Sequence, residues 1–432
     1  MPDLLPPRPR HDPYAALRLP EFRAYIFARF ALTLALQMQG TVVGWQVYLL
    51  TGDKLSLGLI GLAEAIPSIS VSLVAGHVAD SVPRRRIVRL ATLGFAICTA
   101  LLWSFVLPAS SAATGYDLYN SLGQLLAQYG AAPIYAVIFL SGLARGFISP
   151  ALFSFMPQLI ADRAVLPNAI TWSSTTWQTA SVAGPALGGL LLGFAGLPVA
   201  YGVDLALTVL SLVILSVAVK PRPLPPRAGV KPPLLESIRG GLQFVFGNQL
   251  ILSSISLDLF AVLFGGAVAL LPVYAQDILH VGPQGLGLLR AAPGVGSVLM
   301  LAVLNYAPVR RHAGRKLLAA VAGFGVATLG FAYSTHFFLS LGLLFATGAF
   351  DAVSVILRSN LLHLYTPEHL KGRVSSVNSI FIGSSNEIGA FESGLAAKLL
   401  GTQASVAFGG AMTLVVVGVT AWKAKALREL EM

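Results

Sequence analysis

Long runs of apolar residues, broken by short polar stretches, dominate the chain from end to end. Twelve such runs cover residues 23–49, 56–79, 87–107, 133–157, 168–193, 197–219, 249–275, 284–307, 316–335, 337–360, 375–400 and 402–422. Each run approaches or exceeds the roughly 20 residues that a helix needs to cross the hydrocarbon core of a bilayer. The pattern predicts about twelve transmembrane helices and therefore an all-α membrane protein.

The composition leads to the same class and adds an orientation. Hydrophobic residues make up 55% and charged residues 11% of the 432 positions, less than half the charged fraction of about 25% found in soluble domains. The net charge of +11 does not indicate a nucleic-acid partner, because the basic residues do not form one patch with interleaved aromatic residues. They fall in alternate loops, which places both termini in the cytoplasm by the positive-inside rule.

The segment between the sixth and seventh runs divides the chain. Residues 220–233 are basic and rich in proline, and residues 234–246 place apolar side chains on one face of an expected interfacial helix. We predict an N-terminal six-helix half over residues 1–219, a cytoplasmic linker with an interfacial helix over 220–247, and a C-terminal six-helix half over 248–432. An additional loop, 108–132, is expected to hold one short helix.

A glycine, a carboxylate and an arginine cluster end the second apolar run. The stretch that contains Gly76, Asp80, Arg84 and Arg85 resembles the loop motif of the major facilitator superfamily, G-x-x-x-D-R-x-G-R-R, with a serine and a proline at two of its positions. The resemblance implies six-helix halves related by an axis along the membrane normal, with a substrate site between them at mid-bilayer. It also implies that Asp80 meets the start of the eleventh helix, near residues 372 and 373, and latches the outward-facing state there.

Small residues and one proline occupy the middle of the fifth run. Residues 180–189, with Gly184, Pro185, Gly188 and Gly189, resemble the superfamily's antiporter motif, G-x-x-x-G-P-x-x-G-G, without its first glycine. Small residues let helices approach closely, and the proline removes one backbone hydrogen bond and bends the helix. The motif indicates export and a role in gating. Ordinary packing of small residues is the alternative.

Several ionisable residues lie inside the predicted spans. Among them are Glu64, Arg145, Asp258, Arg290, Asp351, Arg358, Glu387 and Glu392. Each costs about 2.5–3.5 kcal/mol at the centre of a helix on the insertion scale, so each has to face protein or water. Together they predict a polar central cavity, although any single one has the alternative role of a buried ion pair that fixes helix packing.

Four of these residues are predicted to couple transport to protons. Arg145 resembles the arginine that proton-coupled antiporters of the superfamily carry in the fourth span, where it acts on a nearby carboxylate. Asp258 is the predicted proton carrier, because burial disfavours its charge, and Asp351 is the second choice. Glu387 is predicted to face the cavity, whereas Glu392 points about 140 degrees away on an ideal helix.

A second set of residues is predicted to line the substrate cavity. These are Glu64, Trp45, Trp177, Arg358 and Asn386. The two tryptophans offer ring faces on which an aromatic or cationic substrate can stack. Packing inside the bundle or anchoring at the membrane interface is the alternative role of each tryptophan.

Other functional classes lack the groups that they require. The sequence contains no G-x-x-x-x-G-K-[ST], no H-E-x-x-H and no Cys/His cluster, which argues against ATP hydrolysis and zinc chemistry. We therefore expect no cofactor, no metal and no enzymatic activity.

Within the superfamily, residues 348–394 resemble the bacterial branch that includes enterobactin exporters. We predict a monomeric, multi-pass protein of the bacterial inner membrane whose partners are a small-molecule substrate, protons and the lipid bilayer. Its predicted function is proton-coupled antiport that exports a small organic compound, siderophore-like or drug-like, by alternating access. Two alternatives stay open: a proton-coupled uptake symporter of the same fold, and a non-transporting membrane sensor.

Overall fold

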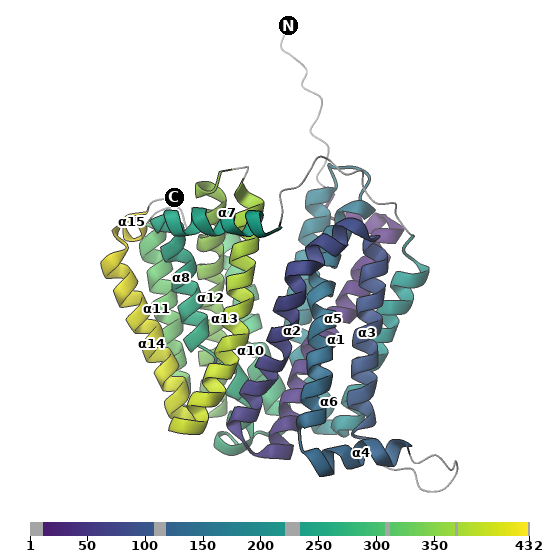
Figure 1. Cartoon of the computed structure of the whole chain (residues 1–432). Helices are drawn as coiled ribbons and strands as arrows, with labels where there is room; N and C mark the ends of the chain where they lie inside the picture. The colour runs from purple at the N-terminus through teal and green to yellow at the C-terminus, as the bar shows by residue number, and fades with distance from the viewer. Residues whose placement is uncertain (1–11, 108–117, 221–233, 307–311, 368–369, 431–432) are drawn as a thin grey trace.

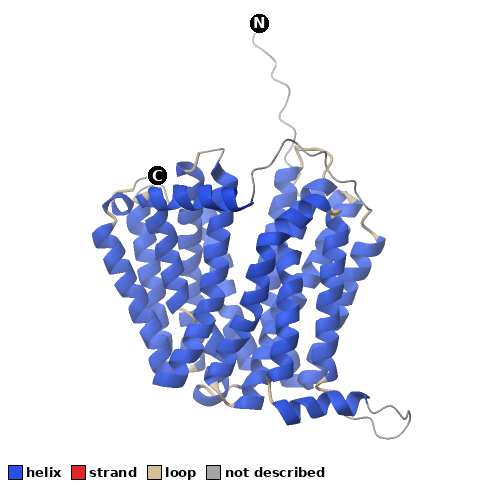
Figure 2. Cartoon of the chain, viewed as in Figure 1, coloured by secondary structure: helices blue, strands red, loops and turns tan. Residues whose placement is uncertain are grey.

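The structure is a computed structural model that describes residues 12–107, 118–220, 234–306, 312–367 and 370–430. Within these ranges every regular element is a helix (Figure 2). The side chains of a few residues near the ends of helices, including 72–77, 79–81, 372 and 373, are not described.

The long helices form two bundles that stand side by side (Figure 1). The first contains α1 (Pro20–Thr51), α2 (Lys54–Ser81), α3 (Arg84–Ser104), α5 (Ala132–Phe155) and α6 (Leu166–Val217). The second contains α8 (Gln249–Phe264), η3 (Ala267–Leu270), α9 (Leu271–Val273), η4 (Tyr274–Ile278), α10 (Gly282–Tyr306), α11 (Ala313–Ala332), α12 (Phe337–Tyr365), α13 (Lys371–Leu400) and α14 (Thr402–Lys423). The shorter elements are η1 (Ala16–Arg18), α4 (Leu118–Tyr129), η2 (Met156–Leu159), α7 (Leu234–Gly247) and α15 (Lys425–Arg428).

The number of membrane crossings follows from the lengths of these helices. In the described part of the chain, 10 helical segments are long and apolar enough to span a bilayer. One of them, α6, is broken at Gly196, where φ is 81° and ψ is 176°, so it supplies two of the predicted spans. Helix α13 has the length of a span but carries polar residues such as Asn386 and Glu387. Counting α6 twice and adding α13 gives the predicted twelve.

The two sides of the molecule differ in the helices that cover them. Helix α1 begins and α14 ends on the side where α7 lies across the second bundle, and α4 lies on the opposite side (Figure 1). We call these the linker side and the α4 side. The predicted domain borders fall between α6 and α7 and between α7 and α8. The division itself stays a prediction, and residues 221–233 of the linker lie outside the described ranges.

The apolar core shows where the bundles touch. One cluster of buried side chains joins both bundles on the α4 side, with Trp45 and Leu57 from the first and Leu270 and Leu289 from the second. On the linker side the core is split into a cluster within the first bundle and another within the second. The bundles are therefore held together mainly at their α4 ends.

Glycines let the helix backbones meet at that end. Helix α2 contacts α13, and α6 contacts α10. A β-carbon added to Gly394 of α13 would lie 2.8 Å from the Cα of Gly58 of α2. A β-carbon added to Gly189 of α6 would lie 2.6 Å from the backbone nitrogen of Gly287 of α10. Only glycine fits such backbone contacts.

Candidate functional site

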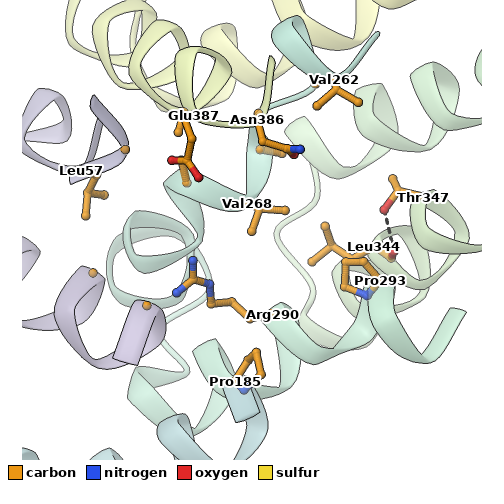
Figure 3. Close-up of a pocket in the computed structure, with 18 of the residues that line it drawn as sticks. Leu57, Pro185, Val262, Val268, Arg290, Pro293, Leu344, Thr347, Asn386 and Glu387 are labelled. Carbon is orange, nitrogen blue, oxygen red and sulfur yellow. Dashed lines mark hydrogen bonds between the residues drawn. The ribbon is translucent and has the colours of Figure 1, made fainter. Parts of the chain in front are cut away.

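A cavity of about 500 Å³ lies between the two bundles and is lined by residues from both (Figure 3). Its ionisable and amide lining residues are Glu64, Arg145, Arg290, Asp351, Gln37, Asn386 and Glu387. Most of these residues lie near the middle of their helices, so the cavity sits at the depth where the bilayer is most apolar. The structure thus gathers five of the ionisable residues that the sequence places inside spans.

Arg145 of α5 lines the cavity on the side of the first bundle and contacts α1 and α2 there. Its Nη1 forms an ion pair with Oε1 of Glu64 on α2 at 2.5 Å. Its Nη2 donates hydrogen bonds to the backbone oxygen of Leu36 at 3.1 Å and to Oε1 of Gln39 at 3.2 Å. The guanidinium also lies over the ring of Phe95, 5.5 Å from its centre. Both charged side chains keep about a fifth of their surface exposed, at 20% and 23%, so the pair is accessible from the cavity.

Three further charges line the second bundle's side. Glu387 of α13 points into the cavity, as does Arg290 of α10 (Figure 3). Glu387 lies within electrostatic range of Glu64 and Arg145, and Arg290 lies within range of Glu64. Among the described residues, Arg290, Asp351 and Glu387 form no ion pair. These groups are available to a substrate or to protons.

The structure corrects the expected position of Arg358. Predicted to line the cavity, it is buried instead in an ion pair with Asp258 inside the second bundle, and neither residue is part of the cavity lining. The reason is its place on α12, seven residues and about 10 Å beyond Asp351 toward the linker side. Asp258 is buried as expected, but its carboxylate is already occupied by the guanidinium.

The two tryptophans also lie away from the cavity lining. Trp45 is 6% exposed and belongs to the apolar cluster that joins the bundles. Trp177 is 49% exposed, on the outside of the described cavity. The alternative roles of packing and anchoring fit these positions better than substrate stacking does.

The small residues of the fifth span pack α6 against helices of both bundles. A β-carbon on Gly188 would lie 2.9 Å from Cγ of Met38 on α1, and one on Gly184 would lie 2.6 Å from Cβ of Gln37. Gly189 faces α10, as described above, and Pro185 lines the cavity. Any movement of α6 relative to α10 therefore changes the contacts that this segment makes.

The arginines at the start of α3 bind the ends of neighbouring helices. Nη1 of Arg84 donates to the backbone oxygen of Ser154 at 3.0 Å. Arg85 donates from Nε to the oxygen of Leu215 at 3.1 Å and from Nη2 to that of Ser216 at 2.5 Å. These carbonyls lie at helix C-termini, which favour cations. The surroundings of Gly76, the side chain of Asp80 and its predicted contact near residues 372 and 373 lie outside the described part of the structure.

Two polar contacts across the bundles were missed by the sequence prediction. The hydroxyl of Tyr48 on α1 donates to the carboxylate of Asp277 on η4. Nζ of Lys398 on α13 lies 3.3 Å from Oδ2 of Asp53, which also caps the start of α2. Both contacts lie on the α4 side and help to close it. The sequence does not reveal these pairs, because a contact between residues far apart in the chain leaves no local pattern.

The comparison with protein families decides the class of the protein. The family model described as Major Facilitator Superfamily matches residues 25–390, most of the chain. The chain belongs to the major facilitator superfamily. It is therefore a multi-pass membrane protein and a secondary transporter of small molecules, not an enzyme, as the sequence predicts.

Curated relatives of this superfamily member extend along nearly its whole length. It is 27% identical over 406 residues to the enterobactin exporter EntS of Citrobacter koseri, covering 92% of this chain and 90% of that protein. It is 26% identical over 407 residues to the enterobactin exporter EntS of Shigella boydii, covering 93% and 90%. The resemblance to this bacterial branch is thus confirmed as a distant one.

Solved structures confirm the fold. The POT family transporter PepTSo matches with a TM-score of 0.67 at 14% identity, over 94% of this chain and 98% of that chain. A mutant of the nucleoside transporter NupG matches with a TM-score of 0.67 at 14% identity, over 93% and 99%. At this level of identity the likeness concerns the fold alone.

Proposed function

We propose that this protein is a proton-coupled antiporter that exports a small organic compound from the cytoplasm across the bacterial inner membrane. The observation that carries the proposal is the cavity between the bundles, where Asp351 and Glu387 form no ion pair with any described residue and lie beside the Arg145–Glu64 pair. The distant full-length similarity to enterobactin exporters supports export and a siderophore-like or drug-like substrate.

The charges of the cavity support exchange between substrate and proton. Three carboxylates face two guanidinium groups, so one negative charge is in excess when all are ionised. In an apolar setting this excess is costly. Either a proton or a cationic group of the substrate removes it. The site needs either the proton or the cationic group of the substrate, but not both at once. It therefore favours the exchange of one for the other, which is antiport.

The positive-inside rule assigns the linker side to the cytoplasm. The described contacts between the bundles lie on the α4 side, which becomes the outer side in this orientation. The conformation is then one that receives substrate from the cytoplasm. Alternating access requires the α4 side to open and the linker side to close, with the same cavity serving both states.

Transport in oriented vesicles tests the direction. In inside-out vesicles with an acidic lumen, we expect radiolabelled iron-free enterobactin or the cation tetraphenylphosphonium to accumulate in the lumen, because protons leave as the compound enters. A protonophore should abolish the accumulation. Accumulation in right-side-out vesicles under an inward proton gradient would instead support an uptake symporter, and would reject export.

The contact between Tyr48 and Asp277 gives a second prediction. A hydrogen bond to a charged group contributes about 1.5–3 kcal/mol, so Tyr48→Phe should raise the ratio of open to closed molecules on the α4 side by roughly tenfold or more. Spin labels at Leu50→Cys and Leu399→Cys, both exposed, would report the distance in a Cys98→Ala background.

Tyr135→Phe is the matched control for this measurement. Its hydroxyl donates to the backbone oxygen of Ser56 at 2.9 Å, a contact within the first bundle. We expect the control to leave the distance distribution unchanged. An equal shift in both variants would show that loss of any tyrosine hydroxyl loosens the protein, and would remove the gating role of Tyr48.

A further inference from the structure

A buried carboxyl group in the first bundle has no role in the function proposed above. Asp204, in the second half of α6, is 0% exposed. Neither of its side-chain oxygens has a hydrogen-bond partner in the described structure. It does not line the cavity.

Asp204 belongs to a polar stripe on an otherwise apolar helix. Tyr201, Asp204, Thr208 and Ser211 recur at spacings of three and four residues and are all buried, so they share one face of α6. The hydroxyl of Tyr201 donates to Oε1 of Gln46 on α1 at 2.5 Å. Thr208 donates to the backbone oxygen of Asp204 at 2.9 Å. The stripe faces the interior of the bundle.

The amide of Gln39 connects this stripe to the cavity. Gln39 of α1 lies beside the carboxyl group of Asp204. Its Nε2 donates to Oγ1 of Thr99 on α3 at 2.9 Å, and its Oε1 accepts from Nη2 of Arg145 at 3.2 Å. Arg145 in turn holds Glu64 at the cavity. One arginine thus has a carboxyl group on either side, one exposed to the cavity and one enclosed.

The other titratable groups around Asp204 are few. Its own helix contributes Tyr201, and α5 contributes Arg145. Cys98 of α3 lies within electrostatic range of Arg145. Helix α1 offers the uncharged amide of Gln39. Arg145 is therefore the one cation in the described surroundings, and Glu64 already engages it.

The free-energy cost of a buried charge decides whether the carboxyl group of Asp204 is neutral or ionised. An ionised carboxylate without a hydrogen bond or a free counterion is strongly disfavoured away from water, and such groups are neutralised. A neutral carboxyl group is tolerated. Its ionisation becomes favourable only if the charge of Arg145 is released from Glu64, which happens when Glu64 itself is protonated.

We propose that Asp204 and Glu64 share one proton and that Arg145 pairs with whichever of the two is ionised. In the conformation described here the proton is on Asp204 and Arg145 pairs with Glu64. In the alternative state the proton is on Glu64, and Arg145 pairs with Asp204. One O–H bond breaks as the other forms, and the net charge of the cluster does not change.

A proton shared by Asp204 and Glu64 would be held inside the first bundle, and Glu64 alone would connect it to the cavity. Glu64 lines the cavity and is partly exposed, whereas Asp204 is enclosed and does not reach it. A role of the shared proton in transport rests on the function proposed above. The protonation of Asp204 does not depend on that function, so it is tested without a substrate.

Infrared difference spectroscopy on the purified full-length protein in lipid nanodiscs tests the proposal. With 13C-labelled aspartate, we expect a protonated-carboxyl band at neutral pH that shifts with the isotope. The band should be lost in Asp204→Asn, whose amide replaces a neutral acid of the same shape, and kept in Asp351→Asn. In Glu64→Gln, Arg145 loses its carboxylate partner, so it should pair with an ionised Asp204 and the Asp204 band should disappear. Adding Arg145→Gln should restore it.

Two outcomes would overturn the proposal. The first is the absence of an isotope-shifted band at neutral pH in the unsubstituted protein, a result that needs no variant to fold. The second is a band that persists in Glu64→Gln, which would make Asp204 a neutral structural group independent of Arg145. Loss of vesicle transport with the infrared pattern intact would instead count against the proposed antiport alone.

Discussion

Replacement of Glu387 by glutamine is expected to abolish accumulation driven by the proton gradient while leaving substrate binding and passive exchange in place. Glu387 points into the cavity, forms no ion pair among the described residues, and lies within electrostatic range of Glu64 and Arg145. Glutamine keeps the shape and the hydrogen-bonding oxygen but cannot take up a proton. The measurement compares accumulation in inside-out vesicles with and without an acidic lumen, together with exchange of labelled compound at equal pH.

Glu392 provides the matched control on the same helix. It lies five residues further along α13, does not line the cavity, and has Ser393 as its hydrogen-bonding neighbour at 3.5 Å. Glu392→Gln should accumulate substrate at the rate of the unsubstituted protein. If Glu387→Gln also does so and Asp351→Asn does not, the coupling group is Asp351. If both retain gradient-driven accumulation, proton coupling through Glu387 and Asp351 is rejected, and Glu64 is the cavity carboxylate that remains to be tested.

Removal of the carboxylate of Asp258 is expected to destabilise the protein rather than to uncouple it. Asp258→Asn leaves the guanidinium of Arg358, which is 4% exposed, without its counterion. Breaking a buried pair on one side costs about 3–5 kcal/mol. The variant should unfold at a clearly lower temperature in detergent, as followed by the fluorescence of its tryptophans.

A double replacement separates stability from coupling at this pair. In Asp258→Leu with Arg358→Met both charges are replaced by apolar side chains, which is often neutral or stabilising. We expect this variant to recover the thermal stability of the unsubstituted protein and its pH-dependent transport. A stable Asp258→Asn variant that transports without pH dependence would restore Asp258 as the proton carrier predicted from the sequence.

The fold was predictable because a bilayer demands one simple pattern. Runs of about 20 apolar residues are easily recognised, and all twelve predicted runs correspond to helices, including the pair that α6 joins across Gly196. Helix α7 also appears where one-sided apolar residues predict it. The resemblance of the loop and antiporter motifs then supplied the superfamily, which the family model confirms.

The partners of individual charges were not predictable in the same way. Asp258 and Arg358 belong to helices a hundred residues apart, and only their packing brings them together. The same limit hid the contacts of Tyr48 and Asp53. Asp204 is a different case, because an aspartate in an apolar run is a visible signal. What the sequence could not tell is that, in the described part of the structure, neither side-chain oxygen of this aspartate has a hydrogen-bond partner.

The glycine contacts between α2 and α13 and between α6 and α10 determine how the transporter responds to substitutions at these positions. Where Gly58 meets Gly394 and Gly189 meets Gly287, no side chains interlock that would have to be disengaged in each cycle. The two helix surfaces can slide past each other easily, but an added side chain does not fit between them. A single added methyl group there acts as a wedge, and its damage should appear as slower cycling at unaltered affinity for the cargo.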